Sequence, residues 1–550
     1  MRAGTLTTVV VATAALALPS TAAAGASAPE AFPNGFMWGT ASSGFQTEMG
    51  AGSAYSDKGS DWWKWVRDPA NISSKKVSGD LPEKGPGGWK TAFSGDIALT
   101  KGLGMNTWRM GFEWSRIFPK ATASVAVGPT ITTTNLKALD KLADAKAVAK
   151  YRTILKSARS KGLRPFVTLN HFTLPLWAHD PIAVRDALSG RGPDSPLPTN
   201  LTSKSGWLAA TTVQEFRKYA AYAAWKFGDL VDWWSPVNEP MVVAVSGFVN
   251  VPGAYANWFP PGVFSYTAAA KAIENLAAAN SVAYSAVHSF DSKDSDGDGK
   301  KAQVGLVQNM IHFTPANPLS ANDVASTDHA DRIFNRLLPD AAINGQLDRN
   351  ANGVADPGEY DPAERNKADF FGVNYYFRGR VTGVGTSLSS TIPLLDFLPK
   401  TGYRWALNPT ADVCPTTCSQ FGSEIDVDGF GAVLREAAGY GKPLIVTENG
   451  IADSGDSQRT EFLVRHLDQA WRVVGEKPGG VPLLGWFHWS LTDNYEWTAG
   501  YTPKFGLYSY SAKTLKRTAR PAAAVVKTIA KGNAIPGEVI DRWINTAPNS

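Results

Sequence analysis

The segments Asp232-Trp-Trp-Ser-Pro-Val-Asn-Glu239 and Pro443-Leu-Ile-Val-Thr-Glu448 each place a carboxylate at or just after the end of a short apolar run. An almost continuously apolar run is typical of a strand that is buried on both faces, as in a parallel sheet. These runs predict strands at residues 232–237 and 443–447. Six further runs of the same kind predict strands at residues 36–41, 105–110, 164–169, 302–308, 369–375 and 482–487.

Helical patterns alternate with the predicted strands. They cover residues 147–160, 213–227, 268–288, 430–438, 461–474 and 520–530. Gly162 and Gly441 stand where a glycine commonly ends a helix. Eight strands that alternate with helices predict an α/β fold, a single (β/α)8 TIM barrel with long inserted loops. A doubly wound open sheet is the alternative that the same pattern allows.

Length and composition exclude several classes of protein. The chain has 550 residues, of which 43% are hydrophobic, so it can bury a large core and is not disordered. Its net charge of +5, without a dense basic run, gives no nucleic-acid-binding footprint. No uninterrupted apolar run reaches the ~20 residues that a membrane-spanning helix needs. We therefore expect neither nucleic acid nor a membrane among its partners.

The N-terminus resembles a secretory signal. Arg2 precedes an apolar stretch at residues 6–18, and small residues suited to an A-x-A cleavage site follow it. We predict a signal peptide at residues 1–28, cleaved between Ala24 and Ala28, and a single secreted (extracellular) domain at residues 29–550. The alternative is a disordered alanine-rich tail. In an oxidising compartment, Cys414 and Cys418 can form a small disulfide, although two free thiols are the alternative.

Polar side chains gather at the C-terminal ends of the predicted strands, where the functional groups of a barrel lie. Those ends carry Arg109, His171, Asn238, Glu239, Asn374, Tyr376, Glu448 and Trp489. Either carboxylate alone has a plain alternative as a helix cap or a surface group. Two carboxylates at matching positions, with aromatic and amide side chains around them, instead favour glycoside hydrolysis, which needs one protonated acid and one ionised carboxylate.

Longer motifs extend this pattern over nearly the whole chain, from about Phe36 to about Asp541. They are Phe36-Met-Trp-Gly-Thr-Ala-Ser-Ser-Gly-Phe-Gln46, Asn170-His171, Asn238-Glu239-Pro240, Asn374-Tyr-Tyr376, Thr447-Glu448-Asn449-Gly450 and Glu496-Trp497. With them the chain resembles glycoside hydrolase family 1, the β-glucosidase/β-galactosidase family. Asp61-Trp-Trp-Lys-Trp-Val-Arg-Asp-Pro69 and Glu113-Trp-Ser-Arg-Ile-Phe-Pro119 are similar to its archaeal-type β-glycosidase branch.

The resemblance implies a role for each matching residue. Glu239 corresponds to the general acid/base and Glu448 to the nucleophile. The other positions correspond to groups that hold the nucleophile or the sugar: Gln46, Arg109, His171, Asn238, Asn374, Tyr376, Trp489, Glu496 and Trp497. Phe172 departs from the family, which usually has tryptophan there, so one indole N–H donor is missing.

The resemblance also implies a retaining exo-β-glycosidase that needs no cofactor for catalysis. The expected substrate is a small oligosaccharide or glycoside. A glucoside is the best single expectation, with galactosides and fucosides as side substrates, and the preference among these three sugars stays open. The oligomeric state, with a homo-oligomer among the options, stays open. A sugar-binding protein without activity is the alternative from another class, but it would have lost one of the carboxylates.

A further motif lies between the fifth and sixth predicted strands, where we expect only a short helix. Asp348, Asn350, Asn352, Val354, Asp356 and Glu359 occupy positions 1, 3, 5, 7, 9 and 12 of a calcium loop, with Gly353 at position 6. The spacing predicts a structural Ca²⁺ site, and a polar turn is the alternative. A calcium-binding interaction module would be a third function for the whole chain, which its size and its set of pocket residues argue against. Asp294, Asp296 and Asp298 begin a similar loop without the final glutamate, and whether they bind calcium is left open.

Overall fold

Eight parallel strands close into a barrel in the computed structural model, which describes residues 27–249, 258–400 and 417–546. In barrel order they are β2 (Met37–Ala41), β3 (Thr107–Gly111), β4 (Arg164–Asn170), β5 (Trp233–Val237), β6 (Gln303–Asn309), β8 (Phe370–Tyr375), β11 (Leu444–Asn449) and β12 (Leu483–His488). The predicted TIM barrel is confirmed, each strand within two residues of its expected bounds, and the open sheet is excluded.

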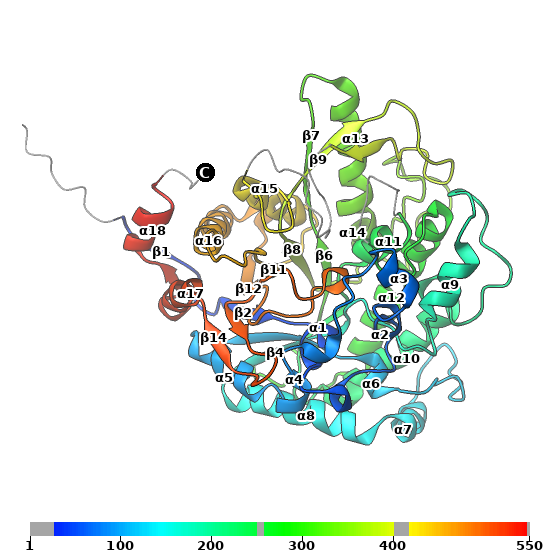
Figure 1. The fold of residues 1–550 in the computed structure, drawn as a ribbon, viewed down its shortest axis with the longest axis horizontal. Coiled ribbons are helices and arrows are strands. Elements are labelled where there is room, and N and C mark those ends of the chain that lie inside the picture. Colours follow the sequence, from blue (N-terminus) through cyan, green and yellow to red (C-terminus); the bar gives the residue numbers. More distant parts are fainter. Residues whose placement is uncertain (1–26, 250–257, 401–416, 547–550) are drawn as a thin grey trace, which may run out of the picture.

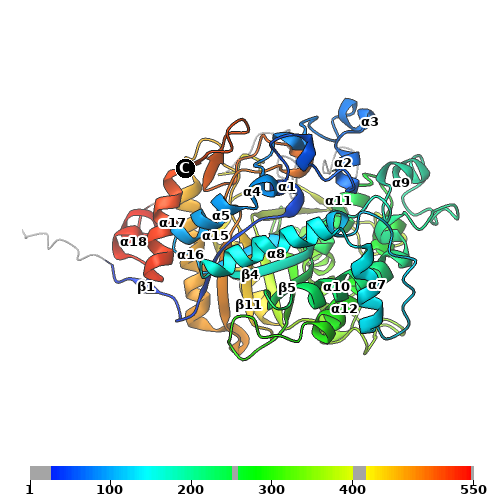
Figure 2. The ribbon, with the colours of Figure 1, turned by 90° about the horizontal axis from the view of Figure 1, so that it is seen from below.

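An outer helix follows each barrel strand. In the same order these helices are α5 (Ser94–Gly102), α8 (Ala145–Ser160), α10 (Ala210–Phe227), α12 (Tyr266–Phe290), α13 (Ala321–Asp331), α15 (Val427–Ala438), α16 (Arg459–Glu476) and α17 (Pro521–Gly532). Gly162 and Gly441, just past two of these helices, have positive φ as expected. Figure 1 shows α15, α16 and α17 on one side of the barrel and α10 and α12 on the other, and Figure 2 shows α8 lying across β4.

The helical segment after β6 is longer than expected. It continues from α13 through a π-helical turn, η4 (Arg332–Arg336), then α14 (Leu337–Pro339) and a second π-helical turn, η5 (Asp340–Asn344). A π turn adds one residue to the helical repeat, so apolar side chains no longer recur at the 3.6-residue spacing that predicts a helix. The expectation of a short helix here is wrong for that reason.

Shorter helices and three small sheets of the described residues lie outside the barrel. The remaining α-helices of the described residues are α1 (Gly44–Glu48), α2 (Asp61–Trp65), α3 (Pro69–Ser73), α4 (Gly88–Thr91), α6 (Trp114–Ile117), α7 (Thr133–Leu142), α9 (Pro181–Leu188), α11 (Pro240–Phe248) and α18 (Gly537–Trp543). Small sheets pair β7 (His312–Pro315) and β10 (Phe397–Pro399) with β9 (Arg378–Gly383), β13 (Tyr508–Tyr510) with β14 (Arg517–Ala519), and β1 (Glu30–Ala31) with β15 (Ala534–Ile535). The last pair brings the two ends of the described chain together beside α18 (Figure 1).

Aromatic rings fill the interior of the barrel. The ring of Phe166 lies 5.6 Å from those of both Phe370 and Phe487, centroid to centroid. Gly305 leaves space for Phe370, because a Cβ at this glycine would come within 2.1 Å of the ring. The Arg109 guanidinium lies 5.7 Å above the centre of the Phe166 ring. The packed rings therefore form a floor under the C-terminal ends of the strands, where the predicted site residues lie.

Some expectations fall wholly or partly outside the described residues. The apolar stretch of the predicted signal peptide and Ala24 lie in residues 1–26, and Cys414 lies in residues 401–416. Cys418 is described and is disulfide-bonded. Among the described helices, none combines the length and the hydropathy that crossing a membrane requires.

Candidate active site

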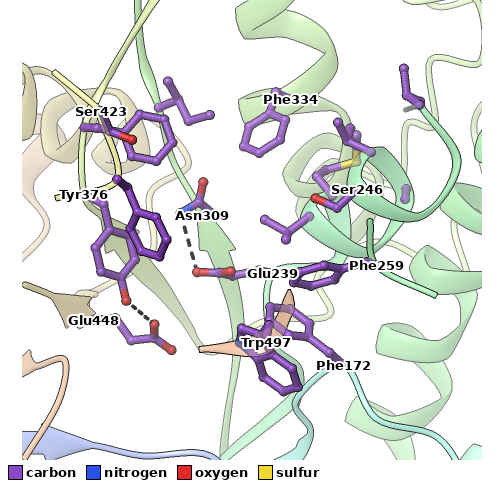
Figure 3. Close-up of a pocket in the computed structure, with 18 of the residues that line it drawn as sticks. Phe172, Glu239, Ser246, Phe259, Asn309, Phe334, Tyr376, Ser423, Glu448 and Trp497 are labelled. Atoms are coloured by element: carbon purple, nitrogen blue, oxygen red, sulfur yellow. Dashed lines mark hydrogen bonds between the residues drawn. The ribbon is translucent and has the colours of Figure 1, made fainter. Parts of the chain in front are cut away.

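Glu239 lies at the first turn of α11, directly after β5, and points into a cavity at the C-terminal ends of the strands (Figure 3). Its φ of +46° is in the left-handed region, which a side chain other than glycine rarely adopts and which often marks a functional position. The Asn374 side-chain amide donates to Glu239 Oε1 at 2.6 Å. Burial, and then the nearby charge of Glu448, raise the pKa of Glu239 to about 8.

Glu448 lies near the end of β11 in a different environment. Arg109 Nη1 contacts its Oε1 at 2.5 Å, and the Tyr376 hydroxyl donates to its Oε2 at 2.5 Å. Burial raises the pKa of Glu448, but the Arg109 charge and the hydrogen bonds from Tyr376 and Arg109 oppose that rise. When the two carboxyls share one proton, it therefore belongs on Glu239, and Glu448 carries the negative charge.

A hydrogen-bonded chain connects the two carboxyl groups. Arg109 Nη2 donates to Asn238 Oδ1 at 2.6 Å, and Asn374 Nδ2 reaches the same oxygen at 3.2 Å as well as Glu239. The Thr447 hydroxyl donates to Asn374 Oδ1 at 2.6 Å, which fixes the orientation of that amide. Arg109, Asn238 and Asn374 thus hold both carboxyl groups in place from behind.

Polar and aromatic side chains form a cup on one side of the carboxyl pair. Gln46 Nε2 donates to Glu496 Oε2 at 3.2 Å, and the His171 ring is stacked with Trp489 and Trp497 at centroid distances of 5.8 and 5.9 Å. Burial, and then the Arg109 charge, lower the pKa of His171 well below its usual range, so the imidazole is neutral. Its buried Nδ1 has no partner among the described residues and is free to bind a ligand hydroxyl.

The structure brings all eleven predicted catalytic and sugar-binding residues together around a cavity of about 140 Å³. Those that line it are His171, Glu239, Tyr376, Glu448, Trp489, Glu496 and Trp497. Gln46, Arg109, Asn238 and Asn374 lie one layer behind and bind the lining residues. Phe172 also lines the cavity, with its ring against Trp497 at 5.0 Å (Figure 3).

Two contacts were not anticipated from the sequence. Asn309, the last residue of β6, lines the cavity, and its amide lies 3.5 Å from Glu239 Oε1. Asn494 accepts a hydrogen bond from Gln46 at 3.0 Å. The position of Asn309 at the C-terminal end of a barrel strand is the signal that would have found it.

The predicted calcium loop lies between η5 and β8. Gly353, at position 6, has a φ of +73°, as the sharp turn of such a loop requires. Asp348 accepts hydrogen bonds from the backbone of Asn352 and Gly353, and the side chain of Asp356 accepts one from the Asn352 amide. Asp348 and the side chain of Glu359 at position 12 are buried, whereas Val354 is exposed. The loop therefore has the expected turn, and calcium binding stays a prediction.

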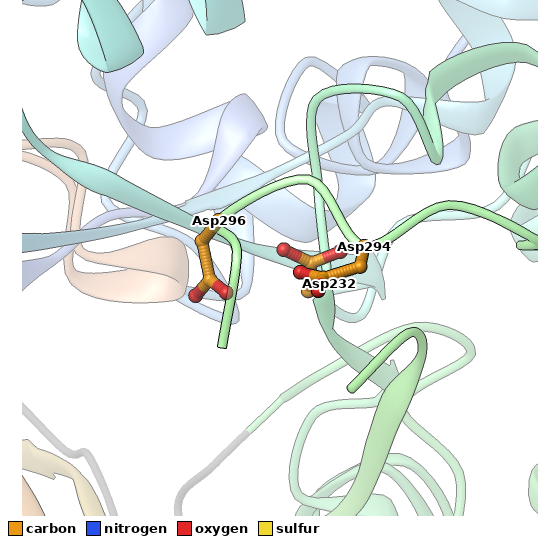
Figure 4. Close-up of side chains that lie close together, drawn as sticks. All are labelled: Asp232, Asp294 and Asp296. Atoms are coloured by element: carbon orange, nitrogen blue, oxygen red, sulfur yellow. The ribbon is translucent and has the colours of Figure 1, made fainter. Parts of the chain in front are cut away.

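A different set of carboxylates converges more closely. Single oxygens of Asp232, Asp294 and Asp296 lie within 4.8 Å of one another (Figure 4), and Asp298 is not part of this group. Ser295 donates its N–H and its hydroxyl to Asp232, and Arg164 Nε binds Asp296 at 2.7 Å. Because protein donors already hold these groups, we assign no metal to them.

Comparison with known proteins places the chain in a family. The model for "Glycosyl hydrolase family 1" matches residues 28–182 and 195–535. A β-galactosidase of Pyrococcus woesei is 38% identical over 526 residues, which cover 92% of this chain and 98% of that protein. β-Glucosidase A of Thermotoga maritima is 27% identical over 539 residues, which cover 92% of this chain and 98% of that protein. The crystal structure of the β-glycosidase from the hyperthermophile Thermosphaera aggregans superimposes on this chain with a TM-score of 0.79 at 37% identity. The match covers 93% of this chain and 99% of that chain. The chain therefore belongs to glycosyl hydrolase family 1, as its resemblance to the archaeal-type branch predicted.

Proposed function

We propose that this glycoside hydrolase is a secreted, exo-acting β-glycosidase that retains the anomeric configuration and prefers glucosides, with galactosides and fucosides as side substrates. The observation that carries the mechanism is the difference between the two carboxyl groups. Glu448 contacts a guanidinium and a phenol, whereas the contacts of Glu239 are neutral amides. An ionised nucleophile and a protonated acid are what double displacement requires.

In the first step, the Glu448 carboxylate attacks the anomeric carbon while Glu239 transfers its proton to the glycosidic oxygen. The leaving group departs as an alcohol, and the sugar stays bound to Glu448 as an ester. In the second step, the Glu239 carboxylate removes a proton from water, which attacks the anomeric carbon and releases Glu448. Both carboxyls then return to their starting states, and no cofactor is consumed.

The cup around His171 supports exo action on a single terminal sugar. Neutral His171 and buried Glu496 offer hydrogen bonds to hydroxyl groups, and the Trp489 ring offers an apolar face to a pyranose. Burial, and then the Glu448 charge, raise the pKa of Glu496 well above its usual range, and no lysine or arginine lines the cavity among the described residues to pair with a phosphate. Unphosphorylated sugars should therefore fit better than their 6-phosphates. Relatives named as a β-galactosidase and a β-glucosidase are consistent with both glycones.

Hydrolysis of a panel of nitrophenyl β-glycosides tests the activity and the glycone. For the mechanism, NMR of the first product should show the β-anomer, and an α-anomer would contradict retention. Glu448→Gly should abolish hydrolysis, with partial rescue by a small anion such as formate. Activity of that variant at the level of the unaltered enzyme would remove Glu448 from the role of nucleophile.

Export is supported by the sequence of the N-terminus and by the position of Ser27. Cleavage after Ala24-Gly25-Ala26 would make Ser27 the first residue of the mature chain. The Ser27 backbone nitrogen lies 3.2 Å from Asp541 Oδ2 on α18, and its hydroxyl lies 2.5 Å from Oδ1. A new α-ammonium at Ser27 would therefore pair with the Asp541 carboxylate.

We also propose that the loop from Asp348 to Glu359 binds Ca²⁺ as a structural ion. Carboxylate, amide and carbonyl oxygens are the ligands that calcium prefers, and the loop offers them at the usual positions. The loop connects η5 to β8 and lines no part of the catalytic cavity, so the ion would contribute to stability rather than to chemistry. The effect of a chelator on thermal unfolding and on turnover separates these roles.

A further inference from the structure

Glu113 opens the motif Glu113-Trp-Ser-Arg-Ile-Phe-Pro119 and lies in the core of the protein. It is the N-cap of α6, only 1% of its surface is exposed, and it is not among the described residues that line the cavity. A carboxyl at such a depth is costly unless hydrogen-bonding partners surround it. The partners of Glu113 therefore show which parts of the chain it connects.

One oxygen of Glu113 holds helix α1. The backbone N–H of Phe45, in the first turn of α1, donates to Glu113 Oε1 at 2.7 Å. The N-cap of this helix, Ser43, makes no capping hydrogen bond, so Glu113 caps the helix from a different segment. Gly44 allows the close approach, because a Cβ there would come within 2.4 Å of the same oxygen. The next residue of the helix is Gln46, whose side chain belongs to the sugar-binding cup.

The other oxygen of Glu113 holds the turn after β4. The Thr173 hydroxyl lies 2.8 Å from Glu113 Oε2, and the Asn170 amide donates to the Thr173 carbonyl at 2.7 Å. Phe172, inside this turn, has a φ of +74°, a left-handed conformation that phenylalanine keeps only where its surroundings fix it. His171 precedes it and points into the cavity. The place of the imidazole in the cup therefore depends on the anchor at Thr173.

A second set of contacts binds the C-terminal end of α1 to the same segment. Glu48, the last residue of the helix, accepts a hydrogen bond from the Tyr151 hydroxyl at 2.8 Å, and Arg116 Nε lies 2.6 Å from its other oxygen. The Tyr151 hydroxyl in turn accepts the backbone N–H of Glu113 at 2.9 Å. Both ends of the short helix that carries Gln46 are therefore fixed against the segment that begins at Glu113.

The surroundings of Glu113 favour its neutral form. Burial, and then the charges of Asp57 and Glu48, raise the pKa of the Glu113 carboxyl well above its usual range. A neutral carboxyl offers one carbonyl oxygen, which accepts from Phe45, and one O–H group, which can donate to the Thr173 hydroxyl oxygen. A glutamine side chain offers the same acceptor and a donor in the same arrangement.

We propose that Glu113 is a positioning residue for recognition of the terminal sugar. It acts through the backbone next to Gln46 and through the turn that carries His171, and it does not touch the substrate. The inference rests on the proposed function, in which these two side chains bind hydroxyl groups of the sugar. Loss of the Glu113 hydrogen bonds should therefore weaken recognition of the sugar hydroxyls.

Two variants of nearly equal size separate hydrogen bonding from packing. Glu113→Gln keeps an acceptor and a donor, whereas Glu113→Met fills the same space with neither. For a nitrophenyl β-glycoside, Glu113→Gln should keep kcat/KM within about twofold, and Glu113→Met should lower it about 25-fold, allowing about fivefold (~1 kcal/mol) for each of the two sugar contacts. Full kcat/KM in Glu113→Met, or an equal loss in both variants, would overturn the inference.

Glycosides that each lack one sugar hydroxyl show whether the loss occurs at the sugar. In the unaltered enzyme, omission of a hydroxyl that Gln46 or His171 binds should lower kcat/KM. In Glu113→Met the same omission should lower kcat/KM about fivefold less, because the contact is already weakened. If every omission has the same effect in the variant as in the unaltered enzyme, Glu113 does not act on sugar recognition. Failure to cleave any nitrophenyl β-glycoside would instead overturn the proposed function.

A buried carboxyl far from the cup provides the matched control. Asp323 also accepts backbone N–H groups from two segments, from Asn317 at 2.9 Å and from Gly383 at 3.1 Å, and it is not among the described residues that line the cavity. Asp323→Leu should lower Tm and leave the effect of each omitted hydroxyl unchanged. If it alters these effects as much as Glu113→Met does, general loosening explains both variants and the inference is wrong.

A double-variant cycle tests the connection to Gln46. Gln46→Ala should lower kcat/KM about fivefold less in Glu113→Met than in the unaltered enzyme, because the first change has already displaced the amide. Independent effects of the two substitutions would contradict the connection. If Glu113→Met does not fold, Thr173→Val decides the question, since it keeps the side-chain shape and removes only the hydroxyl at Glu113 Oε2. It should reduce the effect of omitting the hydroxyl that His171 binds, and an unchanged effect would overturn the inference.

Discussion

Replacing Tyr376 by phenylalanine removes one hydroxyl group from the surroundings of Glu448 and keeps the ring in the cavity wall. That hydroxyl donates to Glu448 Oε2 at 2.5 Å. The hydrogen bond stabilises the ionised carboxylate, so it lowers the pKa of Glu448. Its loss should raise that pKa, and the enzyme should then need a higher pH to ionise its nucleophile.

The size of the shift follows from the strength of the bond. A hydrogen bond to a charged group contributes about 1.5–3 kcal/mol. At 1.36 kcal/mol per pKa unit, the acid limb of the pH profile of kcat/KM should move upward by about 1–2 units. At a fixed pH on that limb, kcat/KM should fall about 10- to 100-fold. The nucleophile stays in place, because Arg109 still binds the other carboxylate oxygen of Glu448, Oε1.

The neighbouring residue provides a matched control. The Tyr375 hydroxyl is buried and donates to the backbone carbonyl of Asp426 at 2.7 Å, outside the cavity. Tyr375→Phe removes an equivalent hydroxyl and should lower the free energy of unfolding by about 1 kcal/mol without moving the acid limb. Full pH profiles with a nitrophenyl glycoside, together with thermal unfolding, measure both effects. If the acid limb of Tyr376→Phe coincides with that of the unaltered enzyme, Tyr376 does not tune the nucleophile.

Three further predictions concern the acid, the ion and the mature chain. Since Glu239 must be protonated to act, kcat/KM should fall as the pH rises through about 8, and Glu239→Gln should remove this basic limb; a limb that persists in the variant belongs to another group. A chelator should lower Tm, by the equivalent of about 2.7 kcal/mol when free calcium was a hundredfold above its Kd, and should leave kcat at moderate temperature unchanged. Glu359→Gln should have the same effect as the chelator. If neither the chelator nor the variant changes Tm or kcat, the loop is only a polar turn. Intact-mass analysis of secreted protein should find Ser27 as the first residue, and active protein that keeps Met1 would contradict export.

The barrel could be predicted because its strands are simple in sequence. Each is a short apolar run buried on both faces, and the buried pattern of β4, β8 and β11 in the structure matches the runs at residues 164–169, 369–375 and 443–447. The segment from α13 to η5 could not be predicted in the same way. Its two π turns shift the apolar positions, and buried contacts from Ile333 and Leu338 to the rest of the core stabilise it instead.

The residues of the candidate site also differ in whether they could be predicted from the sequence. Glu239 and Glu448 could be found because each places a charged side chain at the end of an apolar strand, where a charge does not contribute to the packing of the core. The apolar part of the cavity wall, which includes Val242, Val245, Ile273, Ile333, Phe334 and Leu395, carries no such signal. These residues come from α11, α12, η4 and the segment before β10. From the sequence alone, a valine or isoleucine in one of those helices indicates an ordinary core position. Only the packing of these elements around a cavity separates a ligand-facing side chain from a buried one.

The acid and the apolar part of the cavity wall are also coupled through the backbone. Glu239 is the N-cap of α11, and Val242 and Val245 follow within its first two turns. One short helix therefore carries both the proton donor and part of the apolar cavity wall. An apolar leaving group that packs against these valines is therefore aligned with the Glu239 carboxyl at the same time. Binding energy spent on alignment raises kcat, whereas binding that is equal in the ground and transition states lowers KM alone. In a series of alkyl β-glycosides, a longer chain should consequently raise kcat as well as lower KM. A series in which KM alone changes would show that this wall binds the leaving group without positioning it.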